Sequence, residues 1–266
     1  MAYHKIKTSQ ENGVAVVTLS DPATLNAAGL DLIGELDAAM QAYAAPDSGV
    51  RCVVITGEGR GFCSGANLSG RGGSESSGEA EPRGAGAALE TVYNPFVSRM
   101  RDYPLPIVTA VNGAAAGIGC SIALMGDIVV AGESGYFLQA FRRIGLVPDG
   151  GATYLLSRLV GKARTMELTL LGEKLPARTA VEWGLINRCV ADAELMPTAM
   201  ELAHALATGP KALGYTRKLV WDGLDAAWDE QLKAERIVQR EAGRTDDSRE
   251  GVLAFLQKRP AQFTGR

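Results

Sequence analysis

Short apolar runs alternate along the first half of the chain with longer segments whose apolar residues recur at helical spacing. Four of these runs are rich in valine and isoleucine and are bounded by Gly, Asn, Asp or Pro, as buried strands are. They cover Val14–Leu19, Arg51–Thr56, Pro106–Val111 and Ile128–Ala131. Between them, Gly29–Tyr43 and Ala87–Met100 have the pattern of helices. This alternation predicts an α/β fold.

Beyond Asp149 the pattern becomes mostly helical, with breaks at Gly and Pro. The expected helices cover Gly150–Val160, Ala163–Leu171, Leu195–Ala207, Leu213–Trp221 and Ala226–Arg240. We therefore expect an α/β core over residues 1–200, followed by a helical C-terminal region over residues 201–266.

The segment Gly70–Ala87 differs from the rest, because it is rich in Gly, Ser and Glu and has almost no apolar residues. Such a composition predicts a surface loop without regular structure. The loop would serve as a lid over a nearby site, or it is a plain disordered insertion.

Composition excludes several classes of function. The net charge of −3 gives no basic surface for nucleic acid or for an anionic membrane. The four cysteines are scattered, and the chain has only two histidines, so we expect buried thiols rather than a metal site or disulfides. No stretch is long and apolar enough to cross a bilayer, and the N-terminus has no apolar leader. We expect a cytoplasmic protein.

Two glycine-rich stretches follow predicted strands, "GRGFCSGANL" at Gly59–Leu68 and "NGAAAGIG" at Asn112–Gly119. The second is spelled like a dinucleotide-binding loop, but it lies over a hundred residues into the chain. Such a loop also needs an acidic residue about 20 positions later, and Asp127 comes too early and on the wrong side of the next strand. Two such loops can instead each direct one backbone N–H into a shared pocket. That arrangement is an oxyanion hole, which stabilises negative charge on a carbonyl oxygen. A tight turn that only packs a helix on a strand is the structural alternative.

Five stretches of the chain carry a resemblance to a known family. They are "LNAA" at Leu25–Ala28, "GRGFCSGANL", "VNGAAAGIGCSIALMGDI", "IGLVPDGGATYLL" and the ending "FLQKRPAQFTGR". Together they resemble the enoyl-CoA hydratase/isomerase, or crotonase, superfamily over nearly the whole chain. The resemblance implies a core of repeated ββα units and a helical C-terminal region used for trimerisation, so that a homotrimer or hexamer is expected. It also implies an acyl-CoA substrate. No cofactor or metal is expected, because coenzyme A enters as part of the thioester.

The same resemblance assigns residues to the site. The thioester oxygen would accept hydrogen bonds from the N–H groups of Ala66 and Ile118. Residues of the last helix would help to enclose coenzyme A, often from a neighbouring subunit. The residues expected to bind substrate or coenzyme A are Leu25, Ala27, Ser64, Ala66, Asn67, Leu68, Phe141, Phe255 and Lys258.

The carboxylates decide which reaction is expected. Hydratases of this family use two glutamates, and these positions fall on Ser121 and Phe141, neither of which acts as a base near neutral pH. Asp149, in "GLVPDGG", is a carboxylate that can remove and return one proton, which is what an isomerase needs. The alternative is that Asp149 only caps a helix.

The spelling "GLVPD" and the C-terminal tail resemble the 1,2-epoxyphenylacetyl-CoA isomerase branch, which belongs to phenylacetate degradation and also shifts double bonds in enoyl-CoA esters. Three alternatives stay open. One is an enoyl-CoA hydratase, and another is an acyl-CoA-binding protein without activity. In the third, Asp149 is a nucleophile as in aryl-CoA dehalogenases, but those also need a histidine base, and His4 and His204 lie outside the motifs.

Overall fold

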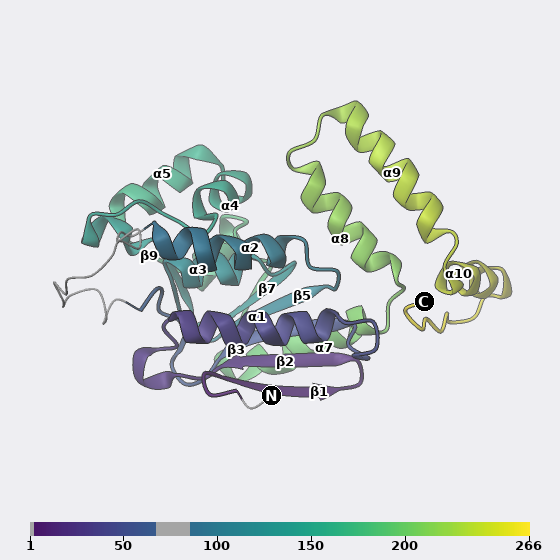
Figure 1. The fold of residues 1–266 in the computed structure, drawn as a ribbon, viewed down its shortest axis with the longest axis horizontal. Coiled ribbons are helices and arrows are strands. Elements are labelled where there is room, and N and C mark those ends of the chain that lie inside the picture. The colour runs from purple at the N-terminus through teal and green to yellow at the C-terminus, as the bar shows by residue number, and fades with distance from the viewer. Residues whose placement is uncertain (1–2, 68–85) are drawn as a thin grey trace, which may run out of the picture.

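The computed structural model describes residues 3–67 and 86–266. Its main sheet has six strands in the order β1 (Ile6–Glu11), β2 (Val14–Leu19), β3 (Cys52–Gly57), β5 (Ile107–Val111), β7 (Ile128–Gly132) and β10 (Arg188–Val190). β1 is antiparallel to β2, and the other neighbours are parallel. The four predicted strands form the centre of this sheet (Figure 1), so the expected α/β fold is confirmed.

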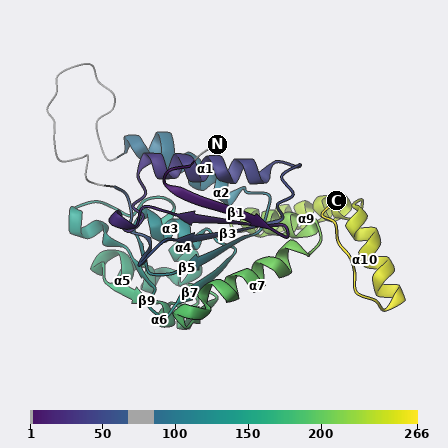
Figure 2. The same ribbon diagram turned by 90° about the horizontal axis from the view of Figure 1, so that it is seen from below.

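Both faces of the main sheet are covered by helices (Figure 2). On one face lie α1 (Leu30–Ala44) and α2 (Asn94–Arg101), and on the other lies α7 (Leu195–Ala207). Along β3, residues alternate between the two cores, which is why the strand is apolar throughout. α7 buries every fourth residue against the sheet, at Leu195, Ala199, Ala203 and Ala207.

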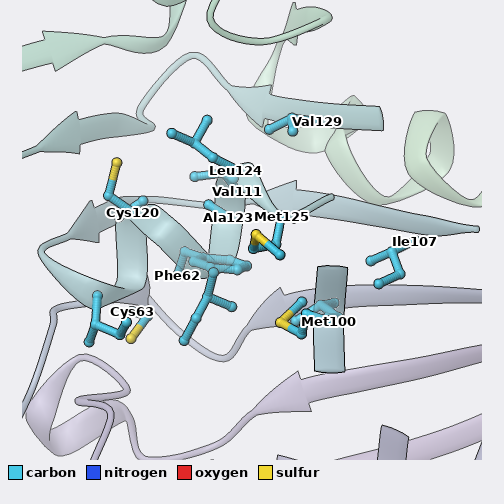
Figure 3. Close-up of a cluster of buried hydrophobic side chains, with 14 of the residues drawn as sticks. Phe62, Cys63, Met100, Ile107, Val111, Cys120, Ala123, Leu124, Met125 and Val129 are labelled. Atoms are coloured by element: carbon cyan, nitrogen blue, oxygen red, sulfur yellow. The ribbon is translucent and has the colours of Figure 1, made fainter. Parts of the chain in front are cut away.

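A second, smaller sheet continues the first. Its order is β4 (Gly61–Cys63), β6 (Ala114–Ala116), β8 (Tyr136–Leu138) and β9 (Lys174–Pro176). β4, β6 and β8 follow β3, β5 and β7 after short turns, and α3 (Ile118–Leu124) comes directly after β6. These are the repeated ββα units that the resemblance implied. Figure 3 shows Phe62 of β4 beside Cys63, Cys120 and Met125 in the core that joins this sheet to α3.

The part of the chain after Asp149 is less uniformly helical than expected. It contains α4 (Ala152–Leu159), α5 (Gly161–Leu171) and α6 (Ala177–Glu182), but it also contributes β9 and β10 to the two sheets. Strands of three residues are too short to show an alternating pattern, which explains why the sequence did not reveal them. The helix expected over Ala87–Met100 is divided into a π-helical turn, Leu89–Tyr93, and α2.

Among residues 3–67 and 86–194, three short 3-10 helices complete the fold, at Pro22–Thr24, Ala140–Ile144 and Asp192–Glu194. Except for its last two residues, the loop expected over Gly70–Ala87 lies outside the described residues. In the part of the chain that the structure describes, no helix has both the length and the apolar character needed to cross a membrane.

The last three helices form an arm that extends away from the sheets (Figures 1 and 2). We call α8 (Ala212–Gly223), α9 (Trp228–Ala242) and α10 (Asp246–Gln257) the C-terminal arm. The domain boundary predicted after residue 200 falls inside α7, which packs on the main sheet. The region that stands apart therefore begins at α8.

One buried arginine fixes the arm to the core. The Nε of Arg217, in α8, donates to the carboxylate of Asp127 at 2.8 Å. Its two terminal nitrogens donate to the carbonyl oxygens of Met100, Arg101 and Tyr103. Because its side chain is only 4% exposed, this guanidinium depends on these partners, and they set the direction in which α8 leaves the core.

Asp247, in the first turn of α10, ties the end of the chain to the start of α8. Its carboxylate accepts hydrogen bonds from the N–H groups of Lys211 (2.8 Å), Thr264 (2.6 Å) and Gly265 (2.9 Å). Burial alone would raise the pKa of Asp247, but these backbone donors, together with Arg51, lower it below its ordinary value. The ionised carboxylate therefore stabilises the arm.

We expect Asp247→Asn to lower the free energy of unfolding by about 1–3 kcal/mol at neutral pH, because the amide places N–H groups against backbone donors. A lowered pKa in the folded protein stabilises it above the ordinary value of about 4, and this contribution is lost as the pH falls through the folded value. The difference in Tm between wild type and variant should therefore be largest at neutral pH and shrink in acid. Asp246→Asn, at a mostly exposed neighbouring position, is the control. A difference that does not change with pH would contradict this account.

Candidate active site

Two loops of the smaller sheet lie against each other. The first, residues 64–67, follows β4, and the second, residues 116–118, joins β6 to α3. Gly65 has a φ of +102°, and a Cβ placed on it would lie 3.0 Å from the carbonyl oxygen of Ala116. A Cβ on Gly117, whose φ is +52°, would lie 3.8 Å from the Cα of Gly65. Glycine at both positions allows the two backbones to touch.

The first turn of α3 begins at this contact. The N–H of Ile118, the first helical residue, has no partner within the helix. Gly119 lets the helix approach β4 closely, because a Cβ there would lie 2.3 Å from the carbonyl oxygen of Cys63 and 2.8 Å from its sulfur. Ala66 and Ile118, the two predicted backbone donors, thus each follow one of the two touching glycines.

The loop Leu25–Ala28 runs along the first of these loops. The N–H of Ser64 donates to the carbonyl oxygen of Leu25 at 3.0 Å, and the N–H of Ala28 donates to that of Gly65 at 2.7 Å. Ala28 and Ala66 form an isolated parallel β-bridge. These contacts bring together five of the residues predicted to bind substrate or coenzyme A, namely Leu25, Ala27, Ser64, Ala66 and Asn67. Leu68, the sixth on these loops, lies outside the described residues.

Two asparagines that the sequence analysis did not assign hold these loops in place. The fully buried Asn26 donates from Nδ2 to the carbonyl oxygens of Gly61 (2.8 Å) and Glu58 (3.0 Å). Asn112 donates from Nδ2 to the carbonyl oxygen of Gly59 at 2.9 Å. Asn26 lies inside the motif "LNAA" and Asn112 inside "VNGAAAGIG", so their place in a motif was the signal that could have marked them. Their role depends on which loops contact each other, and the sequence does not contain that information.

Asp149 lies where the chain turns into α4, beside the first turn of α3. Its carbonyl oxygen accepts a hydrogen bond from the Ser121 hydroxyl at 3.3 Å. A Cβ on the next residue, Gly150, would lie 2.0 Å from the Cδ1 of Ile118. Asp149 is half-buried, and its Oδ1 is buried. The carboxylate and the N–H of Ile118 are therefore carried by segments in direct contact.

The N-cap residue of α4 is Gly151, so the alternative in which Asp149 is the helix cap is wrong. The chain passes through two glycines with positive φ before the helix starts, which places Asp149 three residues upstream of Ala152. The preference of Asp for helix starts does not explain its position.

The two positions at which hydratases would carry glutamate hold buried residues without charge. Ser121 is fully buried, and its hydroxyl is directed at the main chain of Asp149. Phe141 is buried beside the second loop, since a Cβ on Gly117 would lie 3.6 Å from its Cζ. Phe141 therefore adds an apolar wall, and among the described residues Asp149 is an acidic side chain on the neighbouring segment.

Two thiols near the loops are not nucleophiles at neutral pH. Burial raises the pKa of Cys63 to about 11 and that of Cys120 to about 12. Only the thiolate is reactive, so both side chains act as small apolar groups. The predicted burial of the cysteines is confirmed for these two and for Cys52, whereas Cys189 is half-buried.

Phe255 and Lys258 lie apart from the other predicted residues within the single chain. Both belong to the end of α10, at the far end of the C-terminal arm (Figure 1). Phe255 is 83% exposed, and Lys258 is exposed too. Their binding to coenzyme A stays a prediction that requires a neighbouring subunit.

The family described as Enoyl-CoA hydratase/isomerase matches residues 9–266. The chain is 44% identical over 261 residues to the 1,2-epoxyphenylacetyl-CoA isomerase of Escherichia coli, covering 96% of this chain and 97% of that protein. It is 33% identical to the 2,3-dehydroadipyl-CoA hydratase of the same organism, over 97% of this chain and 98% of that protein. The resemblance to the isomerase branch is confirmed, and hydratases are relatives as well.

Solved structures agree with the sequence comparison. An enoyl-CoA hydratase/isomerase from Cupriavidus metallidurans matches with a TM-score of 0.90 at 30% identity, covering 100% of this chain and 98% of that one. An enoyl-CoA hydratase from Bacillus anthracis matches with a TM-score of 0.90 at 27% identity, covering 99% and 100%. Sequence and fold thus agree over nearly the whole length: the chain belongs to the enoyl-CoA hydratase/isomerase family.

Proposed function

We propose that the protein is an acyl-CoA isomerase in which Asp149 moves a proton while an oxyanion hole holds the thioester enolate. The hole consists of the N–H groups of Ala66 and Ile118. Coenzyme A lies along the loops that carry Leu25, Ala27 and Asn67 and enters as part of the substrate. The reaction needs no metal and no resident cofactor.

The observation that carries this proposal is the pairing of Asp149 with the first turn of α3. A base and an oxyanion donor must lie on opposite sides of the same small group of atoms to act on one thioester. The close approach of Gly150 to Ile118 supports this pairing, because it brings the two segments that carry these groups into contact. The two hydratase positions, Ser121 and Phe141, supply no second carboxylate.

The proposed chemistry balances with one carboxylate. Asp149 removes a proton from the carbon next to the thioester of a 3-enoyl-CoA, and the electron pair moves onto the carbonyl oxygen. The two N–H groups stabilise that oxygen. The protonated Asp149 then returns its proton to the far end of the conjugated system, which yields the 2-enoyl-CoA. Nothing is oxidised or reduced.

The acyl group is proposed from the E. coli relative, whose name specifies an epoxide of phenylacetyl-CoA. An epoxyphenylacetyl thioester and a 3-enoyl thioester share one feature. In both, the bonds that change lie close to the thioester carbonyl. Phe141 offers an apolar surface that suits an aromatic ring as well as an aliphatic chain. We therefore propose a role in phenylacetate degradation, with double-bond migration in enoyl-CoA esters as a related activity.

The test is double-bond migration by the purified protein with a 3-enoyl-CoA in deuterated water. We expect the 2-enoyl-CoA as product, with the double bond moved and no water added. Hydration of a 2-enoyl-CoA to the 3-hydroxyacyl-CoA, without migration of the double bond of the 3-enoyl-CoA, would instead identify a hydratase, the activity named for several relatives. Tight binding of the ester without any reaction would identify a binding protein that has kept the fold.

We further propose that the protein assembles as a homotrimer or a pair of trimers through the C-terminal arm. The arm exposes large apolar side chains that a single chain leaves uncovered. They are Val220, Leu224, Trp228, Leu232, Val252, Leu253, Phe255 and Leu256. Such an interface would also bring Phe255 and Lys258 to the coenzyme A loops of a neighbouring copy.

Light scattering should give the wild type a mass of three or six chains of 28.0 kDa. Trp228→Asp combined with Phe255→Asp should yield single chains, because two charges would be buried without partners at the interface. Gln257→Asp adds the same charge at an exposed polar position of α10 and should leave the mass unchanged. A wild-type mass of one chain would contradict the proposed assembly.

A further inference from the structure

The structure points to Ser121 as a positioning residue for Asp149, through the hydrogen bond from its buried hydroxyl to the Asp149 main chain. This inference rests on the proposed role of Asp149 as the base. Ser121 itself touches no substrate in this account. Its function is to fix how far the carboxylate stands from the first turn of α3.

One turn of α3 carries both Ile118 and Ser121. Residues three apart on a helix lie on the same face, so both side chains meet the segment that follows Asp149. A Cβ on Gly150 would lie 2.0 Å from the Cδ1 of Ile118 and 3.5 Å from the Cβ of Ser121. The helix that provides the proposed oxyanion donor thus also supports the backbone of the proposed base.

The turn after Asp149 needs this support. Gly150 and Gly151 have φ values of +58° and +81°, and glycine has more conformational freedom than any other residue. The carbonyl oxygen of Asp149 accepts one hydrogen bond from within the turn, from the N–H of Ala152 at 3.0 Å. The bond from Ser121 comes from outside the turn and connects it to α3.

Removing the Ser121 hydroxyl should therefore change the position of Asp149 rather than the binding of coenzyme A. The loops predicted to bind coenzyme A belong to other elements, residues 25–28 and 64–67. At 3.3 Å the hydrogen bond is longer than is usual for an O–H···O bond, so its loss should cost little stability. Small displacements of a reacting group, in contrast, reduce rates strongly.

The test is steady-state isomerisation of a 3-enoyl-CoA by Ser121→Ala. We expect kcat to fall about tenfold, with KM within about twofold of the wild type and Tm within a few degrees. Ser157→Ala is the matched control, because Ser157 is exposed on α4 and its hydroxyl also donates to a backbone carbonyl, that of Tyr154 at 3.2 Å. It should leave kcat unchanged.

The pair Ser121→Thr and Ser121→Val separates the hydroxyl from the shape of the side chain, because the two residues differ only in that group. Thr should retain about tenfold more kcat than Val. Equal activity of Thr and Val, or full activity of Ser121→Ala, would overturn the inference. Asp149→Asn in the same assay distinguishes failure of this inference from failure of the proposed mechanism. If that variant isomerises like the wild type, Asp149 is not the base and the proposed mechanism has failed, whatever the Ser121 variants do.

Discussion

Asp149→Asn is expected to reduce the rate of double-bond migration about 10³-fold, the largest effect of any single substitution that leaves the fold intact. The amide has the shape of the carboxylate but cannot take up the proton that must leave the carbon next to the thioester. Because the loops proposed to bind coenzyme A are other segments, KM should stay within about threefold of the wild type. The measurement is kcat and KM for a 3-enoyl-CoA, together with deuterium uptake into substrate and product.

A matched control is Asp47→Asn, which makes the same change at an exposed turn between α1 and β3. It should have wild-type kinetics. If Asp149→Asn keeps its isomerase rate, the base is another group and the proposed mechanism is wrong. If the wild type hydrates 2-enoyl-CoA and the variant hydrates it equally well, the protein belongs with the hydratases, and Asp149 has no part in the chemistry.

The central strands could be predicted because both of their faces are buried. Alternate residues of β3 and β5 pack against the core below α1 and α2, and the others pack against α7. Both strands are therefore apolar on both faces, which makes them recognisable as buried strands in the sequence. The edge strand β1 could not be recognised in the same way, because only its first residue, Ile6, is buried. β10 has three residues, and it pairs with β7, more than 50 positions away in the chain.

Some residues of the candidate site could be predicted from the sequence and others could not. Motif residues such as Ala66 and Ile118 could be assigned by resemblance, and the structure places them after two touching glycines. The contact from Ser121 to the backbone of Asp149 could not be predicted, because it joins residues 28 positions apart through a main-chain atom that no motif describes. At the sequence level, Ser121 showed only that a glutamate was missing.

The packing between Ser121 and the segment of Asp149 leaves no room for a glutamate at position 121. Ser121 is fully buried, and the segment of Asp149 and Gly150 packs directly on it. A longer acidic side chain would displace that segment and leave a charge in a buried place. In this chain, a glutamate at position 121 is therefore expected to disturb the segment that carries Asp149.

Gly119→Ala is expected to reduce activity strongly as well as to destabilise the protein. The added Cβ would lie 2.3 Å from the carbonyl oxygen of Cys63 and 2.7 Å from its Cβ, so α3 must move away from β4. That movement separates Ile118 from Ala66 and opens the proposed oxyanion hole. We expect kcat to fall at least 10²-fold and the free energy of unfolding to fall by about 1–3 kcal/mol.

Gly34→Ala is the matched control, since a Cβ on Gly34, at an exposed position of α1, would meet nothing within 4 Å. Because alanine favours the helix, this variant should be more stable than the wild type by about 0.5–1 kcal/mol and fully active. The decisive comparison is made well below the Tm of Gly119→Ala, where the variant is folded. Full activity there would show that the α3–β4 contact serves stability alone. Loss of activity in the folded variant would instead connect the distance between the two loops directly to catalysis.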